Sequence, residues 1–126
     1  MSANTELVDR FIGEWKSKDV DSIMRYFAED AVYINVPIVQ PNIGTPAIRA
    51  VIEMFVGMAT EVEFIVHRSA EDPANGVVMN ERTDRFQING KWLELPVMGV
   101  FEIVEGKIRA WRDYFDLGTW QRAMDP

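Results

Sequence analysis

The stretch VVMNERTDRFQINGKWLELPVMGVFEIVEGKIRAWRDYFDL, residues 77–117, decides the fold. Asn89-Gly90 and Glu105-Gly106 interrupt it, and Asn75-Gly76 precedes it. Asn-Gly between extended segments is a strong signal for a tight hairpin turn. Together with the β-branched and aromatic residues between them, these turns predict an antiparallel meander of four strands over 61–72, 77–88, 91–104 and 107–117. Pro96 and Gly99, inside the third of these strands, are interpreted as a bend or bulge.

The residues before the meander predict helices and one further strand. An apolar stripe over 5–17 predicts a helix that Thr5 would cap. A second, short helix is expected over 19–28 behind Asp19, with Phe27 facing inward. A third is expected to start at Thr45-Pro46, where Thr45 can be the cap. Residues 31–37 read as a strand. Helices that precede a run of antiparallel strands indicate the α+β class.

The composition narrows the classes of function. The chain has 126 residues, a net charge of −7, one histidine and no cysteine. This length predicts one domain over residues 1–126. An acidic chain lacks the basic surface that nucleic acids and anionic membranes attract, and its residues offer little to a metal. Proton transfer in an enzyme of this composition would depend on carboxylates, Tyr or Lys.

No secretory signal or apolar run of the roughly 18 residues that a membrane span needs is visible in the sequence. We therefore expect a soluble cytoplasmic protein that binds neither nucleic acid nor membrane.

Charged residues alternate into faces that otherwise look like core. The two predicted faces are Val78, Asn80, Arg82, Asp84 and Phe86 on one strand, and Arg109, Trp111, Asp113 and Phe115 on another. Aromatic faces are expected to point inward, which would bury Arg82, Asp84 and Asp113. Because an unpaired buried charge costs several kcal/mol, these three groups are expected to pair.

An Asp–Arg–Asp cluster can support acid–base chemistry. The guanidinium fork can bind two carboxylates at once. Such an arrangement would separate the two aspartate pKa values, so that one carboxyl stays protonated while the other accepts a proton. Buried Arg–Asp pairs also serve purely to hold strands together, and the spacing alone leaves that structural role open.

Three segments resemble the limonene-1,2-epoxide hydrolase family, which belongs to the NTF2-like, ketosteroid-isomerase-like superfamily. They are YFAEDAVYINVP (26–37), NERTDRF (80–86) and GVFEIVEGKIRAWRDYFDL (99–117). Y-x-N-x-P, E-R-x-D and W-R-D-Y-F-D in this order are far more specific than a lone R-x-D. The resemblance spans nearly the whole chain. It implies three N-terminal helices packed in the concavity of a strongly curved, mixed, mainly antiparallel sheet, the NTF2-like cone.

The resemblance also implies a catalytic set: Asp113, Arg82, Asp84, Tyr33 and Asn35. Asp113 would be the general base that takes a proton from a water molecule held by Tyr33 and Asn35. Asp84, protonated, would donate to the epoxide oxygen, and Arg82 would bridge the two aspartates. The implied reaction adds water to a small apolar or cyclic, terpene-like epoxide and gives a vicinal trans diol in one step. It needs no covalent intermediate, metal or cofactor.

By the same resemblance, an apolar substrate pocket would be lined by Ile12, Trp15, Phe55, Phe86, Leu95, Val97, Phe115 and Trp120. For any one of these residues, plain core packing is the favoured explanation. Trp15 and Trp120 look larger than the usual occupants, which affects the choice of substrate rather than the chemistry. Because proteins of this fold commonly pair through the sheet, we also expect a homodimer.

Two other classes of function compete with this interpretation. A ketosteroid-isomerase-like or polyketide-cyclase-like enzyme would use a carboxylate to remove a carbon-bound proton, but an enolate site needs one base and neutral donors rather than an arginine between two acids. A non-catalytic NTF2-like binding module would have no need for five polar groups in an apolar pocket.

Overall fold

The computed structural model describes residues 2–38 and 40–124. In chain order its elements are α1 (Ala3–Glu14), η1 (Trp15–Ser17), α2 (Val20–Met24), β1 (Phe27–Asn35), η2 (Val36–Ile38), β2 (Asn42–Ile43), α3 (Thr45–Met58), β3 (Glu61–Asp72), η3 (Pro73–Asn75), β4 (Val77–Ile88), β5 (Lys91–Val104), β6 (Lys107–Tyr114) and α4 (Leu117–Met124). Helices therefore come first and the long strands second, which confirms the α+β class.

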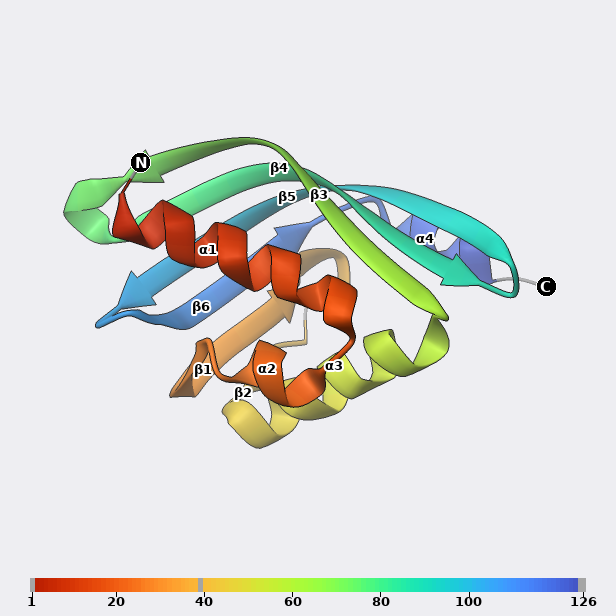
Figure 1. Cartoon of the computed structure of the whole chain (residues 1–126), viewed down its shortest axis with the longest axis horizontal. Coiled ribbons are helices and arrows are strands. Elements are labelled where there is room, and N and C mark those ends of the chain that lie inside the picture. Colours follow the sequence, from red (N-terminus) through yellow and green to blue (C-terminus); the bar gives the residue numbers. More distant parts are fainter. Residues whose placement is uncertain (1, 39, 125–126) are drawn as a thin grey trace.

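The six strands form one mixed sheet in the order β2-β1-β6-β5-β4-β3. Strands β3 to β6 pair antiparallel with their neighbours in sequence, as the turn residues predict, and β1 pairs antiparallel with β2. The exception is β1, which runs parallel to β6. This parallel pair joins the N-terminal half of the chain to the end of the meander (Figure 1).

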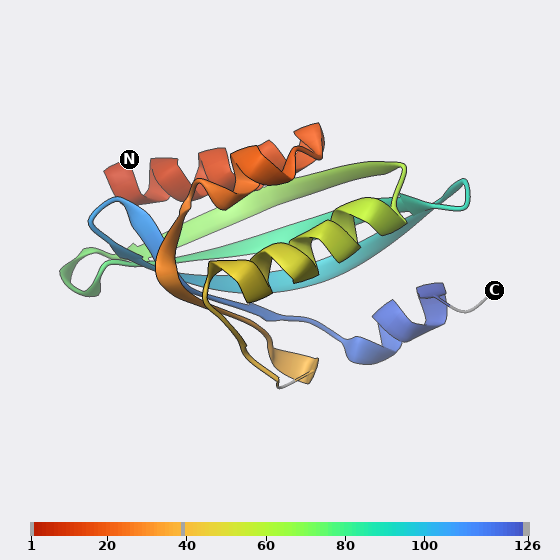
Figure 2. The same cartoon turned by 90° about the horizontal axis from the view of Figure 1, so that it is seen from below.

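The first three helices enclose the core against the sheet. Helix α1 lies across β3 and β4, and α3 packs on β1 (Figure 1). Phe11 of α1 sits at the centre, with its ring edge-on to Trp111 of β6 at 5.0 Å between centroids. Helix α4 contacts β5 and lies on the side of the molecule away from α1 (Figure 2). Within the described residues, no helix combines the length and the apolar character that crossing a bilayer requires.

Two predicted helix caps are wrong by a few residues. The N-cap of α1 is Ser2, whose hydroxyl accepts from the backbone N–H of Thr5, and Thr5 itself is buried in the first turn. Helix α3 begins with Gly44 at its N-cap, with no side-chain cap, because Thr45 already has helical geometry ahead of Pro46. The Asp19 cap is confirmed, since its carboxylate accepts from the N–H groups of Asp21 and Ser22.

The ends of two other predicted elements also differ. Helix α2 stops at Met24, so Phe27 is buried from β1 instead of from a helix. Strand β6 stops at Tyr114 instead of at residue 117, and it is followed by α4 (Leu117–Met124), which was not predicted. Asp116 begins this helix, because its carboxylate accepts from the backbone N–H of Thr119.

The predicted face of β6 is wrong at one position. The pairing of β5 with β6 shifts between Glu102 and Ile103, so Ile108 is buried and Arg109 is exposed. An extra residue in one strand of a pair reverses the alternation on its far side. Trp111 and Asp113 lie beyond the shift and do share the inner face. Pro96 and Gly99 mark no bulge, because the register between β4 and β5 is continuous past both.

Candidate active site

A cluster of polar side chains lies on the inner face of the sheet, among the aromatic residues of the core. Strand β4 contributes Asn80, Arg82 and Asp84 from alternate positions, and β6 contributes Asp113. The Arg82 side chain has no exposed surface, and those of Asp84 and Asp113 are 6% and 5% exposed. The three predicted charged groups are therefore buried together.

Arg82 holds the cluster through both edges of its guanidinium. Its Nε and Nη2 donate to the two oxygens of Asp84, each at 3.0 Å. Nη2 also donates to Oδ2 of Asp113 at 2.8 Å, so a single nitrogen bridges the two carboxyls. On the opposite edge, Nη1 donates to Oδ1 of Asn80 at 2.9 Å. This fork of donors fixes both aspartates relative to one plane.

Trp111 fixes the other oxygen of Asp113. Its indole Nε1 donates to Oδ1 at 2.7 Å from two residues earlier on the same strand. The indole is itself held between two rings, since Tyr33 stacks on it at 4.1 Å and Phe101 at 5.6 Å between centroids. Asp113 is thus bound at both oxygens by groups that packing keeps in place.

The parallel pairing of β1 with β6 brings the Y-x-N motif to Asp113. The register places Tyr33 beside Trp111 and Asn35 beside Asp113. Both residues are buried, and the Tyr33 hydroxyl donates to Oδ1 of Asn35 at 3.1 Å. The structure therefore brings all five residues of the predicted catalytic set into one region, although they come from three strands.

Gly99 of β5 makes room for the cluster. It pairs with Asn80 on one side and with Asp113 on the other. A methyl group at this position would overlap Nη1 of Arg82, and it would lie 2.9 Å from Oδ1 of Asp113 and 3.0 Å from Oδ1 of Asn80. The guanidinium therefore occupies the space that a side chain on the central strand would fill.

Burial and charge shift the ionisation of three groups in the cluster. Burial raises the pKa of Asp113 to about 6, against the opposing attraction of Arg82, and the nearby Asp84 carboxylate adds to the rise. Burial would lower the pKa of Arg82, but the two aspartates raise it further, so the guanidinium stays charged. Burial, followed by the charge of Asp113, also raises the pKa of Tyr33 well above its usual value, so its hydroxyl keeps its proton.

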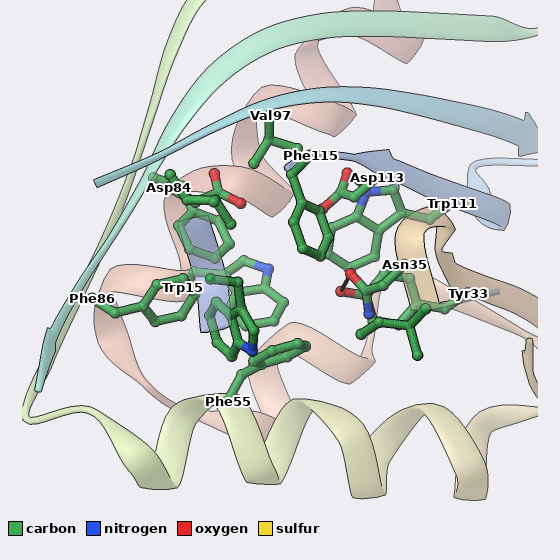
Figure 3. Close-up of a pocket in the computed structure, with 14 residues that line it drawn as sticks. Trp15, Tyr33, Asn35, Phe55, Asp84, Phe86, Val97, Trp111, Asp113 and Phe115 are labelled. Atoms are coloured by element: carbon green, nitrogen blue, oxygen red, sulfur yellow. Dashed lines mark hydrogen bonds between the residues drawn. The ribbon is translucent and has the colours of Figure 1, made fainter. Parts of the chain in front are cut away.

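A cavity of about 400 Å³, including its open mouth, adjoins the cluster. Its wall is formed by Trp15, Tyr33, Asn35, Ile38, Phe55, Phe64, Asp84, Phe86, Leu95, Val97, Trp111, Asp113, Phe115 and Trp120. Asp84 lies on one side of this cavity and Asp113, Tyr33 and Asn35 lie on the other (Figure 3). Arg82 is not part of the wall, so it sits behind the two carboxyls.

Seven of the eight predicted pocket residues line this cavity, and Ile12 does not. Ile12 is 2% exposed and belongs to the core under α1, whereas Trp15, three residues later, reaches the wall. Phe64 and Ile38 line the cavity without having been predicted. Among the described residues, no group of three or more metal-binding side chains is placed to hold a metal ion.

Three residues of the cluster were not predicted to belong to the site, although the sequence contains a pattern that places each of them near it. Asn80 and Trp111 stand two residues before Arg82 and Asp113, and hence on the same strand faces. Gly99 lies opposite Asn80 once the Asn89-Gly90 turn sets the register of the hairpin. The alternation rule was therefore sufficient to place them near the charges, but not to show what they bind.

Residues 2–124 match the limonene-1,2-epoxide hydrolase catalytic domain. The chain belongs to the limonene-1,2-epoxide hydrolase family. The match covers every residue of the cluster and the cavity wall, so the resemblance seen in three motifs extends over the whole described chain.

Two relatives agree with membership of this family, and a third, of lower identity, shares the fold. Epoxide hydrolase EphG of Mycobacterium tuberculosis is 33% identical over 110 residues, which cover 87% of this chain and 71% of EphG. The solved structure of an LEH-like epoxide hydrolase of M. tuberculosis has a TM-score of 0.81 at 28% identity and covers 97% of this chain and 89% of that one. The epoxide hydrolase/cyclase-like enzyme SalBIII shares the fold, with a TM-score of 0.81 at 20% identity and 92% of each chain covered.

Proposed function

We propose that this protein hydrolyses a small, largely apolar or cyclic epoxide to a vicinal trans diol in a single acid–base step. The observation that carries the proposal is the Arg82 bridge between two buried carboxyls that both face one apolar cavity. Opening an epoxide requires a base to activate water and an acid to protonate the leaving oxygen, and two carboxyls in unequal environments can supply both.

Asp113 is the proposed general base. With a pKa of about 6 it is mostly ionised at neutral pH, yet it is basic enough to accept a proton from water. Tyr33 and Asn35 lie on its side of the cavity and offer a hydroxyl and an amide that can orient the attacking water. In this scheme one O–H bond of the water breaks, its proton passes to Asp113, and the oxygen attacks a ring carbon.

Asp84 is the proposed general acid, acting from the opposite side of the substrate. Both of its oxygens accept from Arg82 in the structure. When one of these oxygens is protonated, it can keep accepting from Arg82 through a lone pair while its O–H donates to the epoxide oxygen. The carbon–oxygen bond breaks as that proton is transferred. Attack and protonation from opposite sides give anti opening and hence a trans diol. Arg82 is a positioning residue, since it does not reach the cavity.

The direct test is the formation of diols from cyclohexene oxide, styrene oxide and limonene oxide by the purified protein. Asp113→Asn and Asp84→Asn should each lower the rate by at least about 10²-fold, in line with the loss of one acid or base group. Glu102→Gln, on the outer face of β5, is the matched control and should leave the rate unchanged. A well-folded protein that turns over none of these epoxides would refute the proposal, and isomerisation of a β,γ-unsaturated ketone would instead indicate an isomerase.

We also propose that the protein is a homodimer that pairs through the outer face of the sheet. On that face Met79, Met98 and Tyr114 are 41%, 44% and 45% exposed, and Met98 pairs directly with Tyr114. Exposed apolar side chains that adjoin one another are typical of an interface. Analytical ultracentrifugation of the wild type and of Met98→Lys tests this proposal, which fails if the wild type sediments as a monomer.

A further inference from the structure

Trp15 presents a hydrogen-bond donor that the described part of the chain leaves unused. The side chain belongs to the cavity wall and is 1% exposed. Its indole Nε1 is buried and has no hydrogen-bond partner among residues 2–38 and 40–124. A buried tryptophan N–H usually finds a partner, and leaving such a donor unpaired costs free energy.

The surroundings of the indole are aromatic. Phe64 stacks on it at 4.7 Å between centroids, and Phe11 and Trp111 approach edge-on at 6.3 Å and 5.9 Å. These rings fix the orientation of the indole but contain no strong acceptor. The indole of Trp111 shows the contrast, since its Nε1 donates to Asp113.

The other unpaired donor of this kind lies away from the cavity. Among the described residues, Nδ2 of Asn80 is the second buried side-chain atom without a partner, and Asn80 is not part of the cavity wall. Of the other polar groups in the wall, the Tyr33 hydroxyl donates to Asn35 and both carboxyls accept from Arg82, while the proposed water site uses the amide of Asn35. Trp15 is therefore the wall residue whose fully buried donor has neither a partner among the described residues nor a part in the proposed water site.

We infer that Nε1 of Trp15 donates a hydrogen bond to an oxygen that the substrate carries in addition to its epoxide oxygen. This inference rests on the proposed function and narrows its substrate class to epoxides with a hydroxyl, carbonyl or ether oxygen near the ring. Trp15 lies on the left of the cavity in Figure 3, between Asp84 and Phe55 and away from Tyr33 and Asn35. The second oxygen is thus bound on the side of the proposed acid, where it does not compete with the attacking water.

The strength of the selection follows from the cost of an unpaired donor. A site built to bind a substrate oxygen discriminates against the analogue that lacks it, because the donor then stays buried and unpaired. A hydrocarbon epoxide such as cyclohexene oxide leaves Nε1 unpaired, whereas a hydroxylated analogue can pair with it.

The kinetic test compares cyclohexene oxide with its analogues that carry a hydroxyl at either of the two ring positions nearest the epoxide. For the wild type, kcat/KM for the better hydroxylated analogue should exceed that for cyclohexene oxide by about 10- to 100-fold. Trp15→Phe removes the N–H and keeps an aromatic ring, so this ratio should fall toward one. Benzothienylalanine at position 15 keeps the indole shape without the donor, and it should lower the ratio in the same way.

A binding measurement tests the same contact without turnover. The four tryptophans give four indole N–H resonances, and Trp15→Phe identifies the one from Trp15. Titration with cyclohexane-1,2,3-triol should move that resonance downfield, whereas cyclohexane-1,2-diol, which has no third oxygen, should move it much less.

The outcomes separate the inference from the proposed function. If the wild type hydrolyses both kinds of epoxide and the ratio in both position-15 variants equals that of the wild type, the inference fails and the epoxide hydrolase stands. An equal loss on every epoxide would also overturn it, because the indole would then serve the epoxide oxygen common to all of them. If no epoxide is hydrolysed, the proposed function fails, and a Trp15 resonance that responds equally to diol and triol rejects the contact as well.

Discussion

On the inner face of β4, Arg82 is fully buried and shares its donors among two aspartates and an asparagine. On the outer face of the same strand, Arg85 is 24% exposed, pairs with Glu63 at 2.6 Å and Glu94 at 3.1 Å, and lies 4.2 Å over the ring of Trp92. Each arginine has two acidic partners. The two clusters differ in their exposure to water, because the inner side chains are buried and the outer ones are partly exposed.

The difference in exposure to water gives the Arg82 cluster and the Arg85 ion pairs different properties. Water screens the outer pairs, so each contributes little to stability and can be lost cheaply. Without water, one arginine faces two carboxyls, and the cluster is neutral only when one of them carries a proton. Burial in the inner arrangement therefore raises the pKa of a carboxyl that lines a cavity, Asp113, which the solvated outer pairs do not do.

The largest effect is expected when each arginine is replaced by methionine. Arg82→Met leaves two carboxyls buried without a cation, and it should lower the free energy of unfolding by about 3–5 kcal/mol and abolish diol formation. Arg85→Met should cost less than about 1 kcal/mol and leave the rate nearly unchanged. Urea unfolding and rate measurements check both, and similar losses in the two variants would contradict the contrast between the faces.

Asp113→Asn is expected to change how stability depends on pH. The pKa of Asp113 is 3.8 in its ordinary state and about 6 in the folded protein, so the folded state binds the proton more tightly. Below pH 3.8 the carboxyl is protonated in both the folded and the unfolded state, so its burial as a charge costs no stability. As the pH rises from 3.8 through about 6, the wild type loses stability. Relative to the wild type, Asp113→Asn should therefore gain up to about 3 kcal/mol between pH 4 and pH 8.

The Tm values of the two proteins at pH 4, 6 and 8 measure this gain. A difference in Tm that does not vary with pH would show that Asp113 ionises normally in the folded protein.

Gly99→Ala should disturb the Arg82 cluster on the inner face of the sheet and leave the ion pairs of the outer face intact. The added methyl group overlaps the guanidinium of Arg82, which should cost about 1–3 kcal/mol. The displaced carboxyls should lower kcat by about 10²-fold. Gly13→Ala in α1 is the control, because nothing lies within 4 Å of its new methyl group, and it should stabilise the helix by about 0.5–1 kcal/mol. Full activity in Gly99→Ala would mean that Arg82 can move without consequence.

The smallest expected effect is on the pH profile of the wild type. A base must be ionised to act, so kcat/KM for a neutral epoxide should fall about tenfold per unit as the pH drops below about 6. Rates between pH 4.5 and 8 measure this. A profile that stays flat down to pH 4.5 would remove Asp113 from the role of base.

Local turn chemistry explains why the meander was predictable. The bounds 61–72, 77–88 and 91–104 agree with β3, β4 and β5, because Gly76 and Gly90 adopt the positive φ that their turns need. Alternation then placed the charged groups on the inner face. Both rules depend only on neighbours in sequence.

What escaped prediction depends on partners distant in sequence. The exposure of Arg109 follows from a register shift against β5, and the role of Gly99 follows from side chains on two other strands. Ile12 and Trp15 share one apolar stripe, but Ile12 lies in the core, whereas the indole of Trp15 stacks on Phe64 and lines the cavity. The strand predicted over 107–117 runs three residues past the end of β6, and no element was predicted for the residues that form the rest of α4.

The parallel pairing of β1 with β6 has a consequence for how the protein folds. It joins residues 33–35 to residues 111–113, across almost the whole meander. Contacts between such distant segments form slowly, because a long loop must close before they gain any stabilisation. The hairpins of β3 to β6 can assemble before β1 arrives, and such an intermediate would contain Arg82, Asp84 and Asp113 but not Tyr33 and Asn35. During refolding, the return of catalytic activity should therefore lag behind the return of β-sheet signal.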